Sequence, residues 1–262
     1  MELLKITVFQ GAQGKVYKGT WEQEDVAIKV LLTQNVDPEL INRELRILDQ
    51  VNHLNIIKFF GFCLQPKKLM ILMEYFPYNN LYEIIFDDDV QEEFTLNLMT
   101  QKSIVLQLCD AVNHLHSRKH PIIHRDIKPS NILLSNQLLL KLCDFGLSTA
   151  AGSNSKIRTS KGHVSTKGSP CYLAPEVLIK KESATVKSDV WACACVIFEL
   201  YSKTEIWNDY CNTTDFKEYI ASVKIPNLSK VPVNVRETLK ACFVDVDQRP
   251  LITELMALLE KF

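Results

Sequence analysis

Three residue types that suit phosphate chemistry lie close together in the segment IIHRDIKPSNILL, residues 122–134. They are the carboxylate Asp126, the cation Lys128 and the amide Asn131. A second carboxylate, Asp144, follows in KLCDFGLS, residues 141–148. Phosphoryl transfer needs an acceptor for a hydroxyl proton, a cation for developing negative charge, and oxygen ligands for a metal that binds polyphosphate. The spacing therefore predicts transfer of a phosphoryl group.

The elements that must position these residues fall into two kinds. The first seventy-odd residues alternate between apolar and polar positions in short runs, which is typical of β-strands. One helix is predicted among them, over DPELINRELRILDQV, residues 37–51, with Asp37 as N-cap and Pro38 in the first turn. The predicted strands are KITVFQ, GKVYKGTW, DVAIKVLL, IIKFFGFCL and KLMILMEYF.

Beyond PYNN, residues 77–80, the apolar spacing changes to that of helices. Long helical segments are predicted over residues 96–120, 187–203 and 249–262. The predicted fold is α+β, with a small β-rich lobe that holds one helix and a larger, mainly helical lobe. The boundary is expected near Phe76–Asn80.

Composition narrows the function classes. The 262 residues carry a formal net charge of −1, which gives no reason to expect nucleic acid as the partner. No apolar stretch approaches the roughly 20 residues of a membrane helix, and the N-terminus lacks the apolar segment of a secretory signal. The eight cysteines form no paired CxxC pattern and are expected to be free thiols, which indicates the cytoplasm, with the nucleus as an alternative. Cys193 and Cys195 lie in an apolar helical run and are expected to be buried.

Taken in order, the motifs GAQGKV, VAIK, a helix glutamate, HRDIKPSN, DFG, APE and DQRP resemble the signature set of eukaryotic protein kinases. The resemblance spans nearly the whole chain. It implies one bilobal kinase catalytic domain over residues 1–262, with an N-lobe of residues 1–76 and a C-lobe of residues 77–262. It also implies ATP as phosphoryl donor, with Mg²⁺ as the metal and Mn²⁺ as a substitute.

The resemblance assigns roles to the catalytic set. Lys29 would contact the α- and β-phosphates and pair with Glu44. Asp126 would receive or orient the hydroxyl proton, and Lys128 would stabilise the transferring phosphoryl group. The metal ligands would be Asn131 and Asp144. His124 is expected to pack in the core with Phe145, Leu48 and Phe59 rather than act as a base.

The resemblance also implies a nucleotide pocket built from two sets of residues. The glycine loop would contribute Gly11, Ala12, Gln13 and Gly14. The adenine pocket would be lined by Val8, Val16, Ala27, Leu133 and Met73, with hinge backbone groups from Glu74 to Phe76.

Two details indicate serine or threonine as the acceptor. Lys128 lies two residues after Asp126, and KGSPCYLAPE, with Ser169, resembles the serine/threonine form. Among these kinases the chain is most similar to the tyrosine-kinase-like group, which includes the TGF-β-activated, mixed-lineage and receptor-interacting kinases. Within this family pattern Arg249 is expected to pair with Glu176 as a structural salt bridge.

A Ser/Thr-rich segment between Asp144 and Glu176 is expected to regulate activity through phosphorylation. Arg125 would receive the phosphate. An upstream kinase, or a second copy of the chain acting in trans, would add it. The first-choice sites are Ser165 and Thr166, and the second-choice sites are Thr159 and Ser160.

Phe9 stands where the kinase glycine loop usually has its first glycine. An active enzyme that phosphorylates protein substrates is the leading interpretation, because Lys29, Asp126, Asn131 and Asp144 are all present. A pseudokinase that binds nucleotide or partners with little turnover is the alternative, and a small-molecule kinase is a third. The acidic insert Asp87–Asp89, with Glu92 and Glu93, is interpreted as a solvated loop, with docking of basic substrates as the alternative. Oligomeric state and flanking domains are left open.

Overall fold

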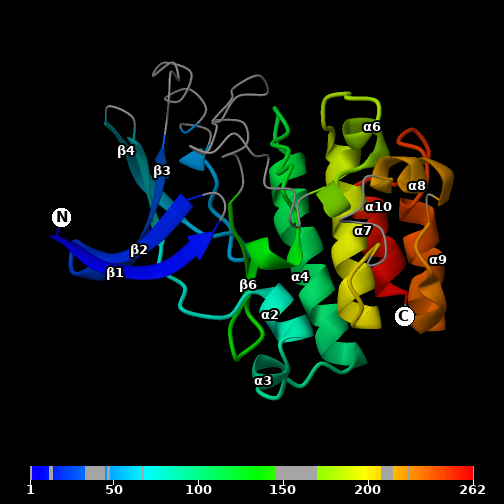
Figure 1. The fold of residues 1–262 in the computed structure, drawn as a ribbon, viewed down its shortest axis with the longest axis horizontal. Coiled ribbons are helices and arrows are strands. Elements are labelled where there is room, and N and C mark those ends of the chain that lie inside the picture. Colours follow the sequence, from blue (N-terminus) through cyan, green and yellow to red (C-terminus); the bar gives the residue numbers. More distant parts are fainter. Residues whose placement is uncertain are drawn as a thin grey trace. The chain divides into compact units, whose positions relative to one another are not determined.

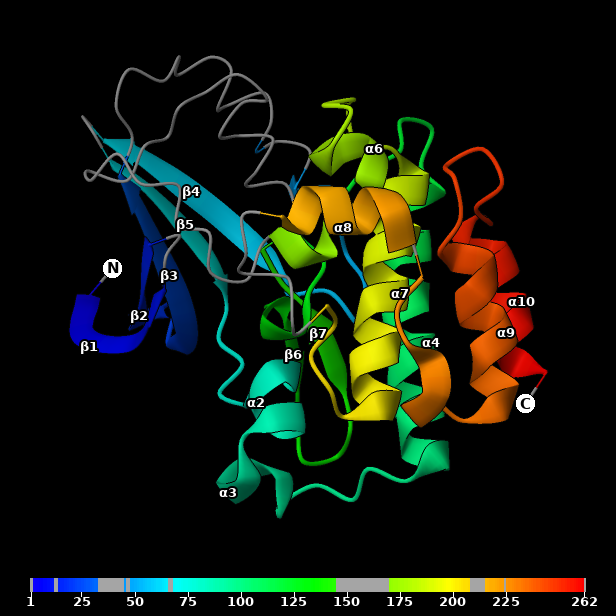
Figure 2. The same ribbon diagram turned by 45° about the vertical axis from the view of Figure 1, so that its right-hand side comes forward.

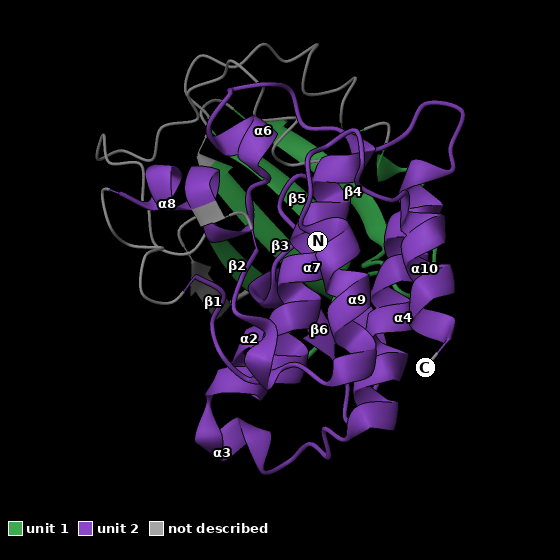
Figure 3. Ribbon diagram, turned by 90° about the vertical axis from the view of Figure 1, so that its right-hand side faces the viewer, with its two compact units in different colours: residues 1–77, 146–165 green, residues 78–145, 166–262 purple. Residues whose placement is uncertain are grey.

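The computed structural model describes residues 2–11, 14–32, 45, 48–65, 68–144, 170–207, 215–223 and 225–261. The chain divides into two compact units, coloured separately in Figure 3. Of the described residues, those up to Pro77 belong to unit 1 and those from Tyr78 onward belong to unit 2. No helix in the described ranges is both long enough and apolar enough to cross a bilayer.

Unit 1 is built on one antiparallel sheet of five strands in the order β1-β2-β3-β5-β4. This confirms the predicted strands. The curved sheet is drawn in blue and cyan in Figure 1. Leu45 and Leu48, from the predicted helix, are helical and buried. The strands are β1 (Glu2–Gly11), β2 (Gly14–Trp21), β3 (Glu24–Leu32), β4 (Phe59–Gln65) and β5 (Lys68–Glu74).

Unit 2 is mainly helical, so the predicted α+β class is confirmed. Its small hairpin consists of β6 (Ile132–Leu134) and β7 (Leu140–Leu142). Figures 1 and 2 both show α4, α7 and α10 side by side, with α9 against α7 and α10. The described helices are α2 (Leu81–Phe86), α3 (Asp88–Gln91), α4 (Leu98–His116), α6 (Pro175–Leu178), α7 (Val186–Ser202), α8 (Phe216–Val223), α9 (Val233–Cys242) and α10 (Ile252–Glu260). Short 3-10 turns occur at η1 (Pro129–Asn131), η2 (Pro170–Tyr172) and η3 (Leu228–Lys230).

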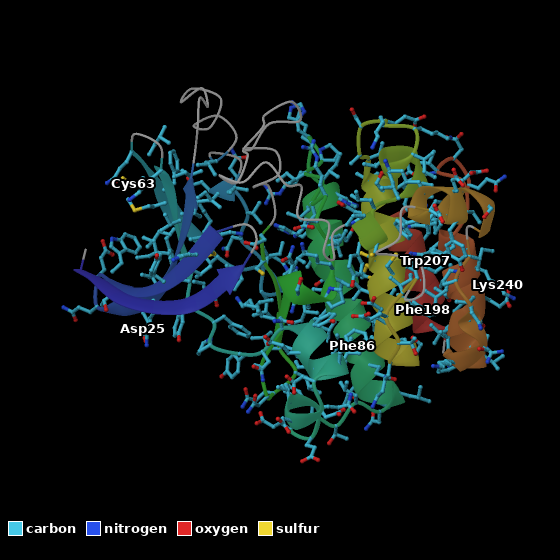
Figure 4. All side chains as sticks on the ribbon, in the orientation of Figure 1. Asp25, Cys63, Phe86, Phe198, Trp207 and Lys240 are labelled. Carbon is cyan, nitrogen blue, oxygen red and sulfur yellow. The ribbon has the colours of Figure 1, made fainter. Side chains whose placement is uncertain are left out.

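The α7 helix is the centre of unit 2, because every residue from Ser188 to Ser202 is buried. An element that is apolar on all sides is expected to be enclosed by others. Its Trp191 stacks on Trp207 with ring centroids 6.5 Å apart and meets the edge of Phe243 at 5.0 Å. Figure 4 labels Trp207 beside this helix, together with Phe198 from α7 itself.

The cysteines of the described ranges are mostly free thiols, as expected. Cys193 and Cys195 are fully buried, which confirms that prediction, and burial raises the pKa of both thiols. Cys171 departs from the expectation because it is disulfide-bonded. A sequence without a paired cysteine spacing gives no local signal for this bond. The free thiols are Cys63, Cys109, Cys143, Cys193, Cys195 and Cys242.

The acidic segment at residues 87–89 was expected to be a loop, but the structure shows the start of a short helix there. Asp87 caps the short helix α3 by accepting a hydrogen bond from the Asp89 N–H at 3.1 Å, and Asp88 and Asp89 occupy the first turn. Acidic side chains stabilise the positive end of a helix, which explains why the charge run is compatible with a helix. All three aspartates are exposed, so the expectation of solvation holds.

Candidate active site

The segment that carries Asp126 is a loop between the long helix α4 and the hairpin β6–β7, as the sequence predicted. The N-cap Asn97 begins α4 by accepting hydrogen bonds from the N–H groups of Met99 and Thr100. The hairpin follows η1 directly, and Leu134 donates its N–H to the Asn79 carbonyl at 3.0 Å. Rigid elements therefore hold both ends of the loop.

Within this loop, Asp126 is the acceptor for two neighbouring side chains. Lys128 Nζ lies 2.9 Å from Oδ1 and 2.9 Å from Oδ2 of Asp126. Asn131 Nδ2 donates to Oδ2 at 2.9 Å and to the Asp126 carbonyl at 2.7 Å. Asp126 and Lys128 are half-buried, whereas Asn131 is buried. The structure thus joins a carboxylate, a cation and an amide that the sequence placed within one segment.

Asn131 and Asp144 are brought to the same end of the β6–β7 hairpin. Ile132 pairs with Leu142, and Cys143 donates its N–H to the Asn131 carbonyl at 2.9 Å, so Asp144 follows directly. Asp144 has a φ of +65°, which turns the chain sharply after β7.

A divalent metal fits this donor pair. The nitrogen of the Asn131 amide faces two acceptors on Asp126, and the amide oxygen is therefore the atom directed elsewhere. An amide oxygen and a carboxylate are ligands that Mg²⁺ prefers. In the described part of the chain, no cluster of three His, Cys, Asp or Glu side chains could hold a metal, so a closed all-protein cage is absent there.

The loop backbone is anchored by Asp189 of α7, whose role the sequence reasoning missed. Its Oδ2 accepts the His124 N–H at 2.8 Å, and its Oδ1 accepts the Arg125 N–H at 2.9 Å. Arg125 has a φ of +69°, a conformation that a non-glycine residue keeps only when its surroundings impose it. The available signal was an aspartate at the start of the otherwise apolar run DVWACACVIF. Such an acid can equally be explained as a charge that favours a helix N-terminus.

His124 is fully buried, which confirms that it packs in the core. Burial lowers the pKa of His124 despite the nearby charges of Asp189, Asp126 and Asp144. The Asp126 N–H donates to Nδ1 at 3.3 Å, so Nε2 carries the proton and donates to the Cys143 carbonyl at 3.1 Å. The imidazole therefore joins the Asp126 loop to the residue before Asp144.

Four residues of unit 1 that are predicted to contact the nucleotide lie on one face of its sheet. Val16 pairs with Lys29, and Ala27 pairs with Met73 across β5. Paired residues and residues two apart on a strand share a face, so these four form one surface. Lys29 is only 3% exposed. The Glu74 N–H donates to the Lys58 carbonyl at 2.8 Å, so this hinge donor is already engaged.

The β1–β2 hairpin holds the glycine-loop residues at its end. The backbone of Phe9 pairs with Val16, and pairing ends where Gly11 faces Gly14. A register shift between Thr7 and Phe9 leaves Val8 as the extra residue of a β-bulge. Leu133, the remaining residue predicted to contact adenine, lies half-buried in β6 of unit 2.

Several predicted residues lie outside the part of the chain that the structure describes, so their predictions stay untested. They are Ala12, Gln13, Glu44, Phe145, Thr159, Ser160, Ser165, Thr166 and Ser169.

The predicted Glu176–Arg249 ion pair is confirmed. Arg249 Nη1 lies 2.8 Å from Glu176 Oε1, and both residues are buried. Burial alone would raise the pKa of Glu176, but the hydrogen bond and charge of Arg249 outweigh it and hold the pKa below its ordinary value. Arg249 also donates to the carbonyls of Cys242, Lys187 and Val244. The pair therefore ties α6 to α7 and to the segment after α9.

A second buried carboxylate, Glu199, lies near the C-terminal end of α7. It accepts hydrogen bonds from the Tyr172 hydroxyl at 3.0 Å and the Ile206 N–H at 2.8 Å. Burial raises the pKa of Glu199 to about 8. Tyr172 lies in η2, two residues before Ala174 of the APE sequence, so Glu199 connects that segment to α7.

Comparison with known proteins agrees with this geometry. A family model described as "Protein kinase domain" matches residues 5–258. The serine/threonine-protein kinase CTR1 of Arabidopsis thaliana is 33% identical over 79% of this chain and 24% of its own length. The dual specificity protein kinase shkC of Dictyostelium discoideum is 33% identical over 80% of this chain and 40% of its own length. The probable serine/threonine-protein kinase SIS8 of Arabidopsis thaliana is 31% identical over 96% of this chain and 24% of its own length.

The chain thus spans less than half of the length of these relatives. The relatives are consistent with the tyrosine-kinase-like group that the motifs resemble. With the family model covering nearly all of the sequence, the chain belongs to the protein kinase domain family.

Proposed function

We propose that this chain transfers the γ-phosphoryl group of ATP to serine or threonine hydroxyls of protein substrates. The observation that supports this most directly is the contact of Asp126 with both Lys128 and Asn131. The three groups supply a proton acceptor, a cation and a metal ligand within one loop. Relatives named serine/threonine-protein kinases support the choice of acceptor.

Each residue of the proposed catalytic and nucleotide-binding sets has a distinct task. Asp126 orients the acceptor hydroxyl and takes its proton, while the Lys128 ammonium offsets charge on the transferring phosphoryl group. Lys29, on the unit 1 sheet, binds the α- and β-phosphates, and Glu44 orients Lys29. Asn131 and Asp144 would hold Mg²⁺, which when bound would neutralise phosphate charge. Val16, Ala27 and Met73 offer an apolar face to adenine.

Phosphate transfer from radiolabelled ATP to a generic basic protein tests this function. The wild type is compared with Asp126→Asn and Lys29→Met, with Mg²⁺ or Mn²⁺ present. Loss of one preorganised charged group is expected to lower the rate by about 10²–10³-fold. Wild-type transfer no higher than that of the variants, with nucleotide binding intact, would support the pseudokinase alternative.

The acceptor residue needs a separate measurement because one relative is named a dual specificity kinase. Phosphoamino-acid analysis of the labelled substrate distinguishes serine and threonine from tyrosine. We expect label on serine and threonine only. Substantial phosphotyrosine would replace the proposed specificity with a dual one.

Regulation is proposed to act through phosphorylation at Ser165 or Thr166, with Thr159 or Ser160 as second choice. Arg125, directly before Asp126, is the proposed partner of the phosphate. Mass spectrometry of active protein tests this, and full activity without modification at these residues would contradict it. We propose a cytoplasmic location, since six of the seven cysteines in the described ranges are free thiols and Cys171 is the exception. Imaging of the tagged protein in cells tests that location.

A further inference from the structure

A pocket of about 160 Å³ lies between α6, α8 and the segment that follows α9, and is here called the α6–α8 pocket. Figures 1 and 2 both show α6 and α8 side by side, and the two helices are in contact. No residue of the loop that carries Asp126 is among the described lining residues, so the pocket is separate from the candidate active site. Its apolar lining comes from Ile179, Trp191, Ile220, Val244 and Val246.

The walls of this pocket are fixed by contacts within unit 2. The buried Glu176–Arg249 pair holds α6 in place. Trp191 stacks on Trp207 with ring centroids 6.5 Å apart, and Trp207 meets Tyr219 of α8 edge-to-face at 6.1 Å. A cavity whose walls are already ordered costs little conformational entropy when it is filled. The pocket is therefore formed before a partner binds.

The volume and the lining suit one apolar side chain. An apolar cavity of about 150 Å³ holds a single benzene molecule. The α6–α8 pocket has a similar volume and an apolar lining, so it can take a side chain of the size of phenylalanine or leucine. Ala221 of α8 lines the pocket and is itself exposed, so the pocket can be entered from the surface.

Two groups at the pocket favour an occupant that carries oxygen and negative charge. Lys180 is exposed, and no other described residue forms an ion pair with it. The buried Nε1–H of Trp191 has no hydrogen-bond acceptor among the described residues, which is rare and costs free energy. The acids of the lining do not oppose an anion, because Glu176 is paired with Arg249 and Asp245 already has a partner within the protein. A carboxylate beside an apolar side chain therefore complements this pocket.

We propose that the α6–α8 pocket docks protein substrates through a segment in which one apolar side chain is flanked by acidic residues. The apolar side chain fills the pocket, and a neighbouring carboxylate faces Lys180. A protein segment suits the pocket better than a free small molecule, because pockets that enclose a whole ligand usually measure about 300–1,000 Å³. This use of the pocket rests on the proposed kinase function. Docking raises affinity for the substrate and takes no part in transfer of the phosphoryl group.

Binding is tested with the peptide Glu-Glu-Phe-Glu-Glu by NMR of the indole N–H signals. The chain has three tryptophans, of which Trp21 in unit 1 is the internal control, and Trp191→Phe assigns the signal of interest. We expect the Trp191 signal to shift and the Trp21 signal to stay in place. Glu-Glu-Ala-Glu-Glu is expected to bind at least about tenfold more weakly, since it lacks the side chain that is buried. An unmoved Trp191 signal at millimolar peptide, or equal binding of Lys-Lys-Phe-Lys-Lys, would overturn the inference.

Two substitutions at exposed positions test the pocket without removing core residues. Ala221→Trp fills the pocket from its rim and is expected to weaken binding of the phenylalanine peptide at least about tenfold. Lys180→Glu reverses the charge at the rim and is expected to weaken binding about threefold or more. The matched controls are Ser222→Trp and Lys181→Glu, at exposed neighbouring positions that are not among the described lining residues. Equal binding by Ala221→Trp and Ser222→Trp would contradict the proposed site.

Kinetics connect the pocket with the proposed function. An acceptor peptide is joined to Glu-Glu-Phe-Glu-Glu, or to its alanine version, through Gly/Ser linkers of several lengths. In wild type, KM is expected to be at least about tenfold lower for the phenylalanine version, with kcat unchanged. Ala221→Trp should abolish this difference and leave transfer to the acceptor peptide alone unchanged. If the wild type transfers no phosphate, the proposed function fails, while the NMR titration still tests the pocket. Equal KM values at every linker length in an active wild type would overturn the role in substrate docking.

Discussion

Unit 1 and unit 2 hold their candidate site residues by different means. In unit 1, Val16, Ala27 and Lys29 share a face because backbone ladders fix the strand register. In unit 2, the catalytic loop has no strand of its own, and a buried carboxylate on α7 binds its backbone. A ladder depends little on side-chain identity, whereas a buried ionic anchor depends on one side chain. Unit 2 should therefore be more sensitive to single conservative substitutions.

The largest effect is expected from Glu176→Gln. This change leaves the buried Arg249 guanidinium without its counter-charge, and breaking a buried pair in this way costs about 3–5 kcal/mol. Denaturant unfolding measures the loss. Because the pKa of Glu176 is lowered in the folded state, the pair stabilises above the ordinary value of 4.5, and its contribution is lost as pH falls through the lower folded value. The difference in free energy of unfolding between variant and wild type should shrink in acid. A difference that widened in acid would contradict the pairing.

Asp189→Asn should rank second and would test the ionic anchor itself. An asparagine offers one acceptor oxygen and turns an amide N–H₂ towards donors. At least one of the N–H groups of His116, His124 and Arg125 therefore loses its partner. We expect a loss of about 2–4 kcal/mol in the free energy of unfolding. Asp88→Asn, an exposed acid on α3, is the matched control and should change stability by less than about 0.5 kcal/mol. Equal effects of the two changes would show that Asp189 is not an anchor.

Glu199→Gln should have a small effect on stability near pH 5 and an effect that grows as pH rises. The folded protein binds a proton at Glu199 up to about pH 8, whereas an unfolded glutamate releases it near 4.5. More protons bound in the folded state mean that stability falls as pH rises across this window. The variant removes this dependence, so its stability relative to wild type should increase from about pH 5 to about pH 9. Urea unfolding across that range measures the free energy of unfolding of both proteins. If this free energy changed with pH in the same way for both, the raised pKa of Glu199 would be contradicted.

Phe9→Gly should have the smallest effect, and it tests whether backbone pairing holds the residues of unit 1 in place. The backbone of Phe9 is held by its pairing with Val16, which glycine can keep. Glycine in a strand costs about 0.5–1 kcal/mol through backbone entropy. We expect a modest change in ATP affinity and nearly unchanged turnover. Thr7→Gly, at another paired position of β1, is the control for the effect of glycine itself. A change in turnover by orders of magnitude for Phe9→Gly alone would show that backbone pairing does not explain how this segment is held.

Much of the fold and site followed from local sequence. The strands of unit 1 and the helices α4, α7 and α10 are set by apolar periodicity, and the loop with Asp126 follows α4 as predicted. The Glu176–Arg249 pair was predicted from family resemblance, since its partners lie far apart in the chain.

Other features had no adequate local signal. The α3 helix was interpreted as a loop because a run of aspartates is typical of solvated segments, and its N-cap is only apparent from the hydrogen bond at Asp87. The disulfide at Cys171 and the raised pKa of Glu199 depend on what surrounds them in the fold.

The sequence by itself determined the chemistry of this protein, because residue type decides which groups can accept a proton, hold a metal or stabilise charge. It placed Asp126, Lys128 and Asn131 in one segment and Lys29 in a strand. Only the tertiary structure decided what orients them. Asp189 binds the backbone of the loop that carries Asp126 from a helix more than sixty residues further along the chain, and a hydrogen bond between such distant segments exists only after the chain has folded.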